Sequence, residues 1–140
     1  MLPNWYVCSA LVMLAFAATS SVAQAPARPD VPVSILASNG GAASCSFGQI
    51  VGLDPKGDGF LSVLSTPGPP YREIDRLYNG QEVDMCDGHG PWVGVVYPGG
   101  RRSPLSVCDN VHRISPVQWA YTGPCASGWV HQRYVRLIAG

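Results

Sequence analysis

The chain has 140 residues, of which nine are basic and nine acidic, so its formal net charge is zero and only 13 % of its residues are charged. This length permits one small domain, and the charge balance provides no basic surface for nucleic acid or an anionic membrane. Sixteen Gly and thirteen Pro are typical of short strands joined by tight turns rather than of a helical bundle. Composition therefore excludes a nucleic-acid-binding protein and a large enzyme core.

An apolar run opens the chain. Residues 7–18 (VCSALVMLAFAA) carry no charge, and small residues follow as far as Ala25, which is the pattern of a secretory signal peptide, although no Lys or Arg precedes Arg28. We predict cleavage after Ala23, so that residues 1–23 are removed, because a cut after Ala25 would place Pro26 directly behind it. A spanning helix needs about 20 apolar residues. A retained membrane anchor is therefore the weaker alternative, and membrane contact is expected only transiently, through the signal segment.

Loss of the signal segment removes Cys8 and leaves four cysteines, Cys45, Cys86, Cys108 and Cys125. An even number in an exported chain indicates two disulfides and a periplasmic or secreted protein. A zinc site would need cysteines two to four residues apart, and the mature sequence has no such pair, so no metal is expected. Of the three possible pairings, we favour Cys108 with Cys125, which bracket one Pro- and Gly-containing segment, and therefore Cys45 with Cys86.

The mature chain divides into a linker and one domain. Residues 24–44 contain three prolines and no sustained periodicity, so they predict a flexible linker, and residues 45–140 form the domain. Alternating or apolar stretches, separated by turn residues that include Asn79-Gly80, predict strands within residues 45–54, 60–65, 73–77, 81–86, 92–97 and 128–138. Spacings of about ten residues, without an amphipathic helix, indicate an all-β fold, a small barrel of five to six strands.

The order of these motifs resembles the bacterial SH3-like domain, a small β-barrel of exported and cell-wall-associated proteins. The similar stretches are LSVLSTPG at 61–68, the hairpin around Asn79-Gly80, WVGV at 92–95 and GWVHQRYV at 128–135. They cover about half of the mature chain. Leu64 and Thr66 replace an arginine and a glycine that are frequent in the family. The resemblance implies an SH3-like barrel that binds and leaves catalysis to other domains.

One long segment departs from the family. Residues 97–127 separate two strands that ordinary members join by a short turn. We interpret them as an inserted loop that the Cys108–Cys125 disulfide closes. A long loop in a small domain is usually functional or locally structured, so this loop is the first place to expect a partner surface.

Polar groups that suggest catalysis or metal binding have simpler explanations. Residues 54–59 resemble the start of a calcium loop, but Lys56 stands where an oxygen ligand is needed and Ser65 where a bidentate glutamate is needed, so the segment predicts a turn. No cysteine is left as a nucleophile and no G-x-S-x-G motif occurs, so the histidines are expected on exposed strands or turns; they are His89, His112 and His131. No catalytic residue and no cofactor is predicted.

Two pairs of carboxylates are spaced like the exposed face of a strand. Glu73 and Asp75 flank Ile74, and Glu82 and Asp84 flank Val83. Alternation along a strand places the acids on the solvent side and the apolar residue inside. A glycosidase would need a deep cleft around two carboxyls, which a small barrel offers poorly.

Aromatic residues are the best candidates for a binding surface. Core packing explains them without a further role, but aromatics between barrel loops also form grooves for extended, proline-containing or glycan-linked peptides. The residues chosen for such a groove are Tyr71, Trp92, Tyr97 and Tyr134. The sequence thus predicts an exported, non-catalytic SH3-like binding module for a peptide, peptidoglycan or another exported protein. The alternatives are a secreted inhibitor or accessory protein acting through the Cys108–Cys125 loop and, third, a small hydrolase.

Overall fold

The computed structural model of the chain describes residues 30–36, 45–69, 72–100, 103–112 and 117–139. Its strands are β1 (Ser34–Ile35), β2 (Ser46–Ile50), β3 (Leu61–Leu64), β4 (Glu73–Leu77), β5 (Glu82–His89), β6 (Trp92–Tyr97), β7 (Trp119–Ala120), β8 (Ala126–His131) and β9 (Val135–Ala139). Two short 3₁₀ helices, η1 (Leu105–His112) and η2 (Gln132–Tyr134), complete the described elements. Of the described helices, none is long and apolar enough to cross a membrane. The predicted all-β fold is confirmed.

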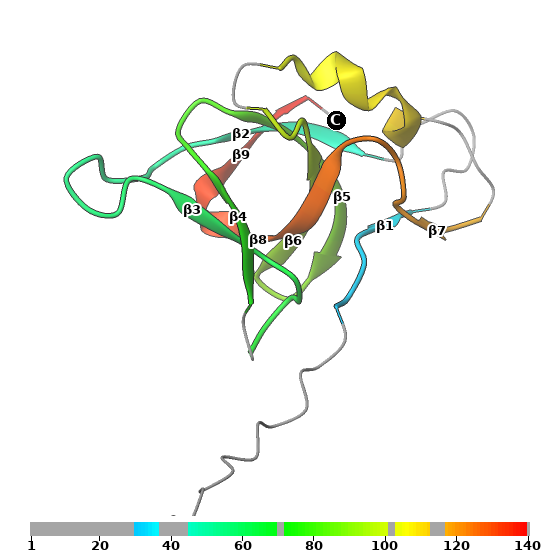
Figure 1. Cartoon of the computed structure of the whole chain (residues 1–140), viewed down its shortest axis with the longest axis horizontal. Helices are drawn as coiled ribbons and strands as arrows, with labels where there is room; N and C mark the ends of the chain where they lie inside the picture. Colours follow the sequence, from blue (N-terminus) through cyan, green and yellow to red (C-terminus); the bar gives the residue numbers. More distant parts are fainter. Residues whose placement is uncertain (1–29, 37–44, 70–71, 101–102, 113–116, 140) are drawn as a thin grey trace, which may run out of the picture.

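The strands form two antiparallel sheets. Seven of them make one sheet in the order β4-β3-β8-β6-β5-β2-β9, and β1 pairs with β7 in a second, small sheet. The large sheet curls around an interior (Figure 1). Its described ladders end at β4 and β9, so a closed barrel and an SH3-like topology stay predictions.

Each stretch expected to form a strand contains one, and the turn at Asn79-Gly80 forms as expected. Gly80 has a φ of 88°, a value that glycine adopts without strain, and the Gln81 amide donates to the Tyr78 carbonyl at 3.1 Å. The strand predicted within residues 81–86 is longer than expected. β5 continues to His89, which pairs with Trp92, because the β5–β6 ladder resumes after a bulge between Met85 and Asp87.

Apolar side chains gather in two cores, one on each face of the large sheet. The inner core contains Ile50, Leu53, Leu61, Val63, Leu77, Val83, Val93, Val95, Tyr97 and Val130. The outer core contains Val33, Ile35, Cys45, Leu64, Cys86, Val96, Cys108, Tyr121 and Trp129. Neighbours in one strand therefore serve different cores, as Val95 and Val96 do in β6. The outer face is covered at β5 and β6, because β1 and η1 lie against β5 and η1 also contacts β6.

The predicted linker is wrong for residues 30–36. Val33 and Ile35 are only 1 % and 0 % exposed, and β1 pairs with β7. Alternating apolar residues in this segment supply side chains that the outer core needs, so the segment belongs to the fold. The rest of the predicted linker, and the predicted signal segment 1–23, lie outside the described residues.

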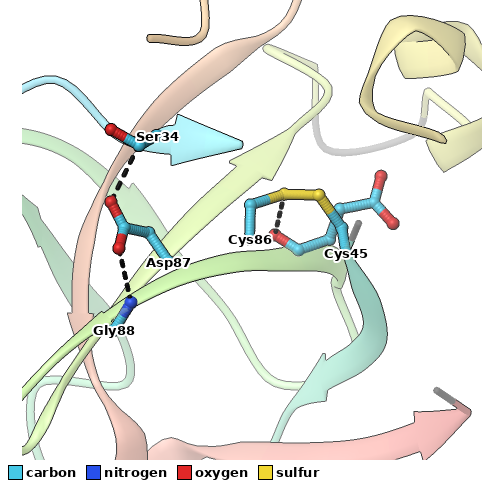
Figure 2. Close-up of a disulfide and its surroundings, with 6 residues drawn as sticks. Ser34, Cys45, Cys86, Asp87 and Gly88 are labelled. Atoms are coloured by element: carbon cyan, nitrogen blue, oxygen red, sulfur yellow. Dashed lines mark hydrogen bonds between the residues drawn. A yellow bond between two sulfur atoms is a disulfide. The ribbon is translucent and has the colours of Figure 1, made fainter. Parts of the chain in front are cut away.

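Both predicted disulfides are confirmed, and both lie in the outer core. Cys45 pairs with Cys86 and Cys108 with Cys125. The Cys45–Cys86 disulfide joins the residue before β2 to β5. Next to it, the Asp87 carboxylate accepts a hydrogen bond from the Ser34 amide of β1 (Figure 2). Two intramolecular disulfides indicate an oxidising environment, extracellular or periplasmic.

The long connection between β6 and β8 is part of the second layer. β6 and β8 pair directly with one another from Trp92 to Tyr97, so the connection joins neighbouring strands, as predicted. The predicted bounds 97–127 are wrong at both ends, because Tyr97, Ala126 and Ser127 belong to this ladder. It contains η1 and β7, and it buries Cys108 and Tyr121 in the outer core. One face of this segment is therefore structural.

The expected alternation of acids and apolar residues holds only in part. Val83 is buried and Glu82 exposed, as predicted, but Asp84 is 1 % exposed because the second layer covers this face of β5. In the edge strand β4, Ile74 was expected inside and is 41 % exposed. The register between β3 and β4 shifts at Val63 and Leu64, and in β4 only Leu77 is buried.

Candidate functional site

A groove of about 390 Å³ is lined by the 52–60 loop, by β3, by the first residue of β6 and the last of β8, and by Tyr134. Its apolar and aromatic lining is Leu53, Phe60, Leu61, Leu64, Trp92, His131 and Tyr134, and its polar lining includes Asp54, Asp58 and Ser62. Concave sites of this size with aromatic walls and a few polar groups are typical of ligand sites. We call it the aromatic groove.

Three rings form one wall of the aromatic groove. Trp92 and His131 are directly opposite each other in the β6–β8 ladder, and their rings meet edge to face at 5.4 Å between centroids. His131 meets Tyr134 in the same manner at 6.4 Å. Edge-to-face pairs hold rings in a defined orientation, so the wall is preorganised.

Backbone hydrogen bonds position the last ring. The Arg133 amide donates to Nδ1 of His131 at 3.2 Å, which caps η2. The Gln132 amide donates to the Pro91 carbonyl at 2.9 Å, and the Tyr134 carbonyl accepts from Val51 at 2.9 Å. Tyr134 is thereby tied to both neighbouring segments.

The 52–60 loop and β3 form the rest of the lining, and Asn79 fixes the base of the loop. The Asn79 side chain accepts from the Leu53 amide at 3.0 Å and donates to the Leu53 carbonyl at 2.8 Å. Within the loop, the Lys56 amide donates to the Asp54 carboxylate at 2.8 Å, so residues 54–59 form the predicted turn. Phe60 is held from outside by the Arg76 guanidinium, 4.0 Å from its ring centroid.

Charges of both signs surround the aromatic groove. Asp54 and Asp58 lie on the loop side, and Arg133 lies 5.9 Å from the Tyr134 ring centroid. Ser62 of the lining also donates to Glu73, which itself lies in the cavity along β4. Hydrogen bonds from Ser62 and Arg76 lower the pKa of this exposed carboxyl. The rim can therefore contact both the amide groups and the charged side chains of a peptide.

The structure brings together only part of the predicted site. Trp92 and Tyr134 line the same groove, and their role in binding stays a prediction. Tyr97 was wrongly assigned to it: the residue is 2 % exposed, belongs to the inner core and contributes to a different cavity of about 440 Å³ along β4. Tyr71 lies outside the described residues.

Sequence reasoning missed Phe60, His131, Asp54 and Asp58 as lining residues. Asp54 and Asp58 were considered only as turn residues, and His131 only as an exposed histidine. The spacing of His131 and Tyr134 offered a signal, because a single 3₁₀ turn brings residues three apart to the same side. Their position near Trp92 depends on the β6–β8 register. The sequence does not indicate this register, because about thirty residues separate the two strands.

Tyr97 has a defined role away from the aromatic groove. Its hydroxyl donates to Asp75 at 2.9 Å, and burial, followed by this bond to a carboxylate, strongly raises the pKa of Tyr97. The residue joins the inner core to the exposed edge strand β4.

Histidine, cysteine and carboxylate side chains are the groups from which a metal site or a catalytic centre would be built. Among the described residues, no group of three or more His, Cys, Asp or Glu side chains is placed to hold a metal ion. All four cysteines of the predicted mature chain are in disulfides. His131 lines the aromatic groove, and His89 is an exposed residue at the end of β5. The side chain of His112 lies outside what the structure describes.

Comparison with protein-family models, with curated proteins and with solved structures finds no match for this chain. The resemblance to the bacterial SH3-like domain therefore stays a prediction based on the motifs quoted above.

Proposed function

We propose that this protein is an exported, non-catalytic binding module that docks an extended peptide in the aromatic groove. The observation that carries the proposal is the continuous wall of Trp92, His131 and Tyr134 facing a loop that is itself anchored by Asn79. A preorganised aromatic wall loses little conformational freedom when a ligand binds.

The peptide class follows from the lining. Aromatic walls accept the stiff, extended backbone of proline-containing or glycan-linked peptides, and Asp54 and Asp58 provide acceptors for amides or a basic side chain. A peptide attached to the cell wall, or an extended segment of another exported protein, has these properties. The proposed location is the periplasm or the cell exterior, reached through the signal segment, and no cofactor takes part.

Co-sedimentation with purified peptidoglycan tests this function. We expect Trp92→Ala and Tyr134→Ala each to weaken binding about tenfold or more, because aromatic residues at the centre of an interface carry much of its free energy. Sacculi from which an amidase has removed the stem peptides are expected to lose binding as well, since the proposed contact is with the peptide.

Phe47→Ala is the matched control, because Phe47 is a half-buried aromatic of β2 that does not line the aromatic groove. It should bind like the wild type. Equal binding by all three variants, or an equal loss in Phe47→Ala, contradicts the proposal, provided that intact mass and circular dichroism show folded, disulfide-bonded chains.

A second candidate is an inhibitor or accessory protein acting through the Cys108–Cys125 segment. It is favoured by two exposed valines on this segment, Val107 and Val117. Combined replacement of both by serine should then abolish binding to an exported partner that Trp92→Ala still binds. The reverse pattern favours the aromatic groove.

A further inference from the structure

The N-terminal segment 30–36, which we call the arm, lies in a seat on the outer face of the large sheet. Its Val31 amide donates to the Ser65 carbonyl at 3.0 Å, and its Val31 carbonyl accepts from the Trp129 indole at 2.8 Å. Further along, the Val33 carbonyl accepts from the Tyr121 amide at 2.8 Å. The arm is thus bound in the way that an extended peptide ligand is bound.

Side chains of the arm complete this fit. Val33 packs on Gly94, where an added Cβ would lie 3.0 Å from a Val33 methyl and 2.7 Å from Cβ of Asp87. Ile35 is fully buried in the outer core, and the Ser34 amide between them donates to the Asp87 carboxylate at 2.9 Å (Figure 2). The seat therefore recognises an extended segment with two apolar residues separated by one.

The residues that hydrogen-bond to the arm lie between Ser65 and Trp129, at least 29 positions beyond its last residue, Leu36. None of these contacts depends on the arm and the seat belonging to the same copy. The arm joins the domain through residues 37–44, which consist of Ala, Ser, Asn and Gly alone. Eight such residues extend to at most about 30 Å, and the domain end of this connection is held at Cys45 by its disulfide with Cys86.

We propose that the seat also accepts the arm of a second copy of this chain, so that two copies associate by exchanging residues 30–36. The contacts within one copy and between two copies are the same, so their free energies cancel, and only the effective concentration of the arm separates the two arrangements. For a short connection this concentration is in the millimolar range. The wild-type chain exchanges arms at comparable concentrations or when refolded at them, and is monomeric when dilute.

Two full-length variants provide the test. In the arm variant, Val33→Asp with Ile35→Asp keeps the seat and prevents its own arm from entering an apolar site. In the seat variant, Gly94→Val blocks the seat and leaves the arm intact. Each alone is expected to stay monomeric by light scattering. Their equimolar mixture is expected to form a heterodimer at concentrations about tenfold or more below those at which the wild type dimerises, because the competing arm of the same copy is removed.

Leu36→Asp is the matched control, because it adds the same charge to the arm at a side chain that is 44 % exposed. Combined with the seat variant, it should give no heterodimer. Ser34→Pro removes the amide that donates to Asp87 without adding charge, and it replaces the arm variant if that chain does not fold.

A measurement on the wild type avoids variants altogether. Differently isotope-labelled full-length chains are refolded together at about 1 mM, and isotope-filtered spectra are recorded on the dimer fraction. Contacts between Val33 of one copy and Trp129 of the other support arm exchange. A mixture that stays monomeric up to this concentration, or a dimer whose intermolecular contacts exclude arm and seat, overturns the proposal.

Discussion

Single residues connect the two faces of the sheet. Tyr97 is in the inner core, yet its hydroxyl donates to Asp75 on the exposed strand β4. On the other face, Gly94 leaves space that Val33 of the arm fills. Both positions are in β6, the strand between β8 and β5 in the large sheet, so changes in this strand affect both cores.

Tyr97→Phe tests the buried hydroxyl. We expect it to lower the free energy of unfolding at neutral pH by about 1 kcal/mol, because it removes one hydrogen bond and no apolar volume. Urea titration followed by tryptophan fluorescence measures this change. An unchanged midpoint would show that the bond to Asp75 contributes nothing to stability.

The same tyrosine predicts a specific alkaline response. Its pKa is raised in the folded chain above the value of about 10 in an unfolded chain. The stabilisation of the folded chain by the protonated Tyr97 hydroxyl is therefore fully present below pH 10. It is lost as the pH rises towards the pKa of Tyr97 in the folded chain. Above pH 10, the wild type should lose about 1.4 kcal/mol per pH unit more than Tyr97→Phe does. Parallel stability curves of the two proteins between pH 9 and pH 11.5 would contradict this assignment.

Among the structural elements, the arm contributes more to the outer core than its seven residues would suggest. It supplies two fully buried side chains and one strand of the small sheet. Its exposed ion pair, Asp30 with Arg72 at 2.6 Å, adds little because solvent screens it. Apolar burial at Val33 and Ile35 therefore holds the arm, with backbone hydrogen bonds to set its direction.

Ile35→Ala should reveal this contribution. Removing a buried isoleucine leaves a cavity and costs about 3 kcal/mol, whereas Leu36→Ala at an exposed position changes stability by less than about 0.5 kcal/mol. Hydrogen exchange should also accelerate at the Tyr121 amide, which donates to the arm. Equal effects of the two substitutions would show that the arm contributes no core.

For the whole molecule, two cores on one sheet require that the second layer be held in place. That layer consists of short elements, and an isolated two-stranded ladder of two residue pairs has little stability of its own. The Cys108–Cys125 disulfide closes the long excursion, and Cys45–Cys86 joins β2 to β5 beside η1 and β1. The disulfides thus supply stability that the small apolar core of a chain of this size cannot provide alone.

Paired Cys→Ala variants measure the cross-links. From the sequence separations of 41 and 17 residues, the chain-entropy model gives losses of about 4 kcal/mol for Cys45–Cys86 and about 3 kcal/mol for Cys108–Cys125. Together these losses approach the whole stability of a small domain, so the fully reduced chain should unfold at 37 °C. A reduced chain that keeps its near-ultraviolet circular dichroism would contradict this prediction.

Local patterns in the sequence determined the strands of the large sheet, the Asn79-Gly80 turn and, through cysteine count and spacing, both disulfides, because these depend on neighbours in the chain or on elimination among few alternatives. The tertiary structure alone decided that residues 30–36 belong to the fold, that Asp84 is buried and that Trp92, His131 and Tyr134 meet. These features depend on a second layer and on a strand register set across the excursion from Pro98 to Cys125. Alternation along a strand records which residues share a face, but it does not record what covers that face.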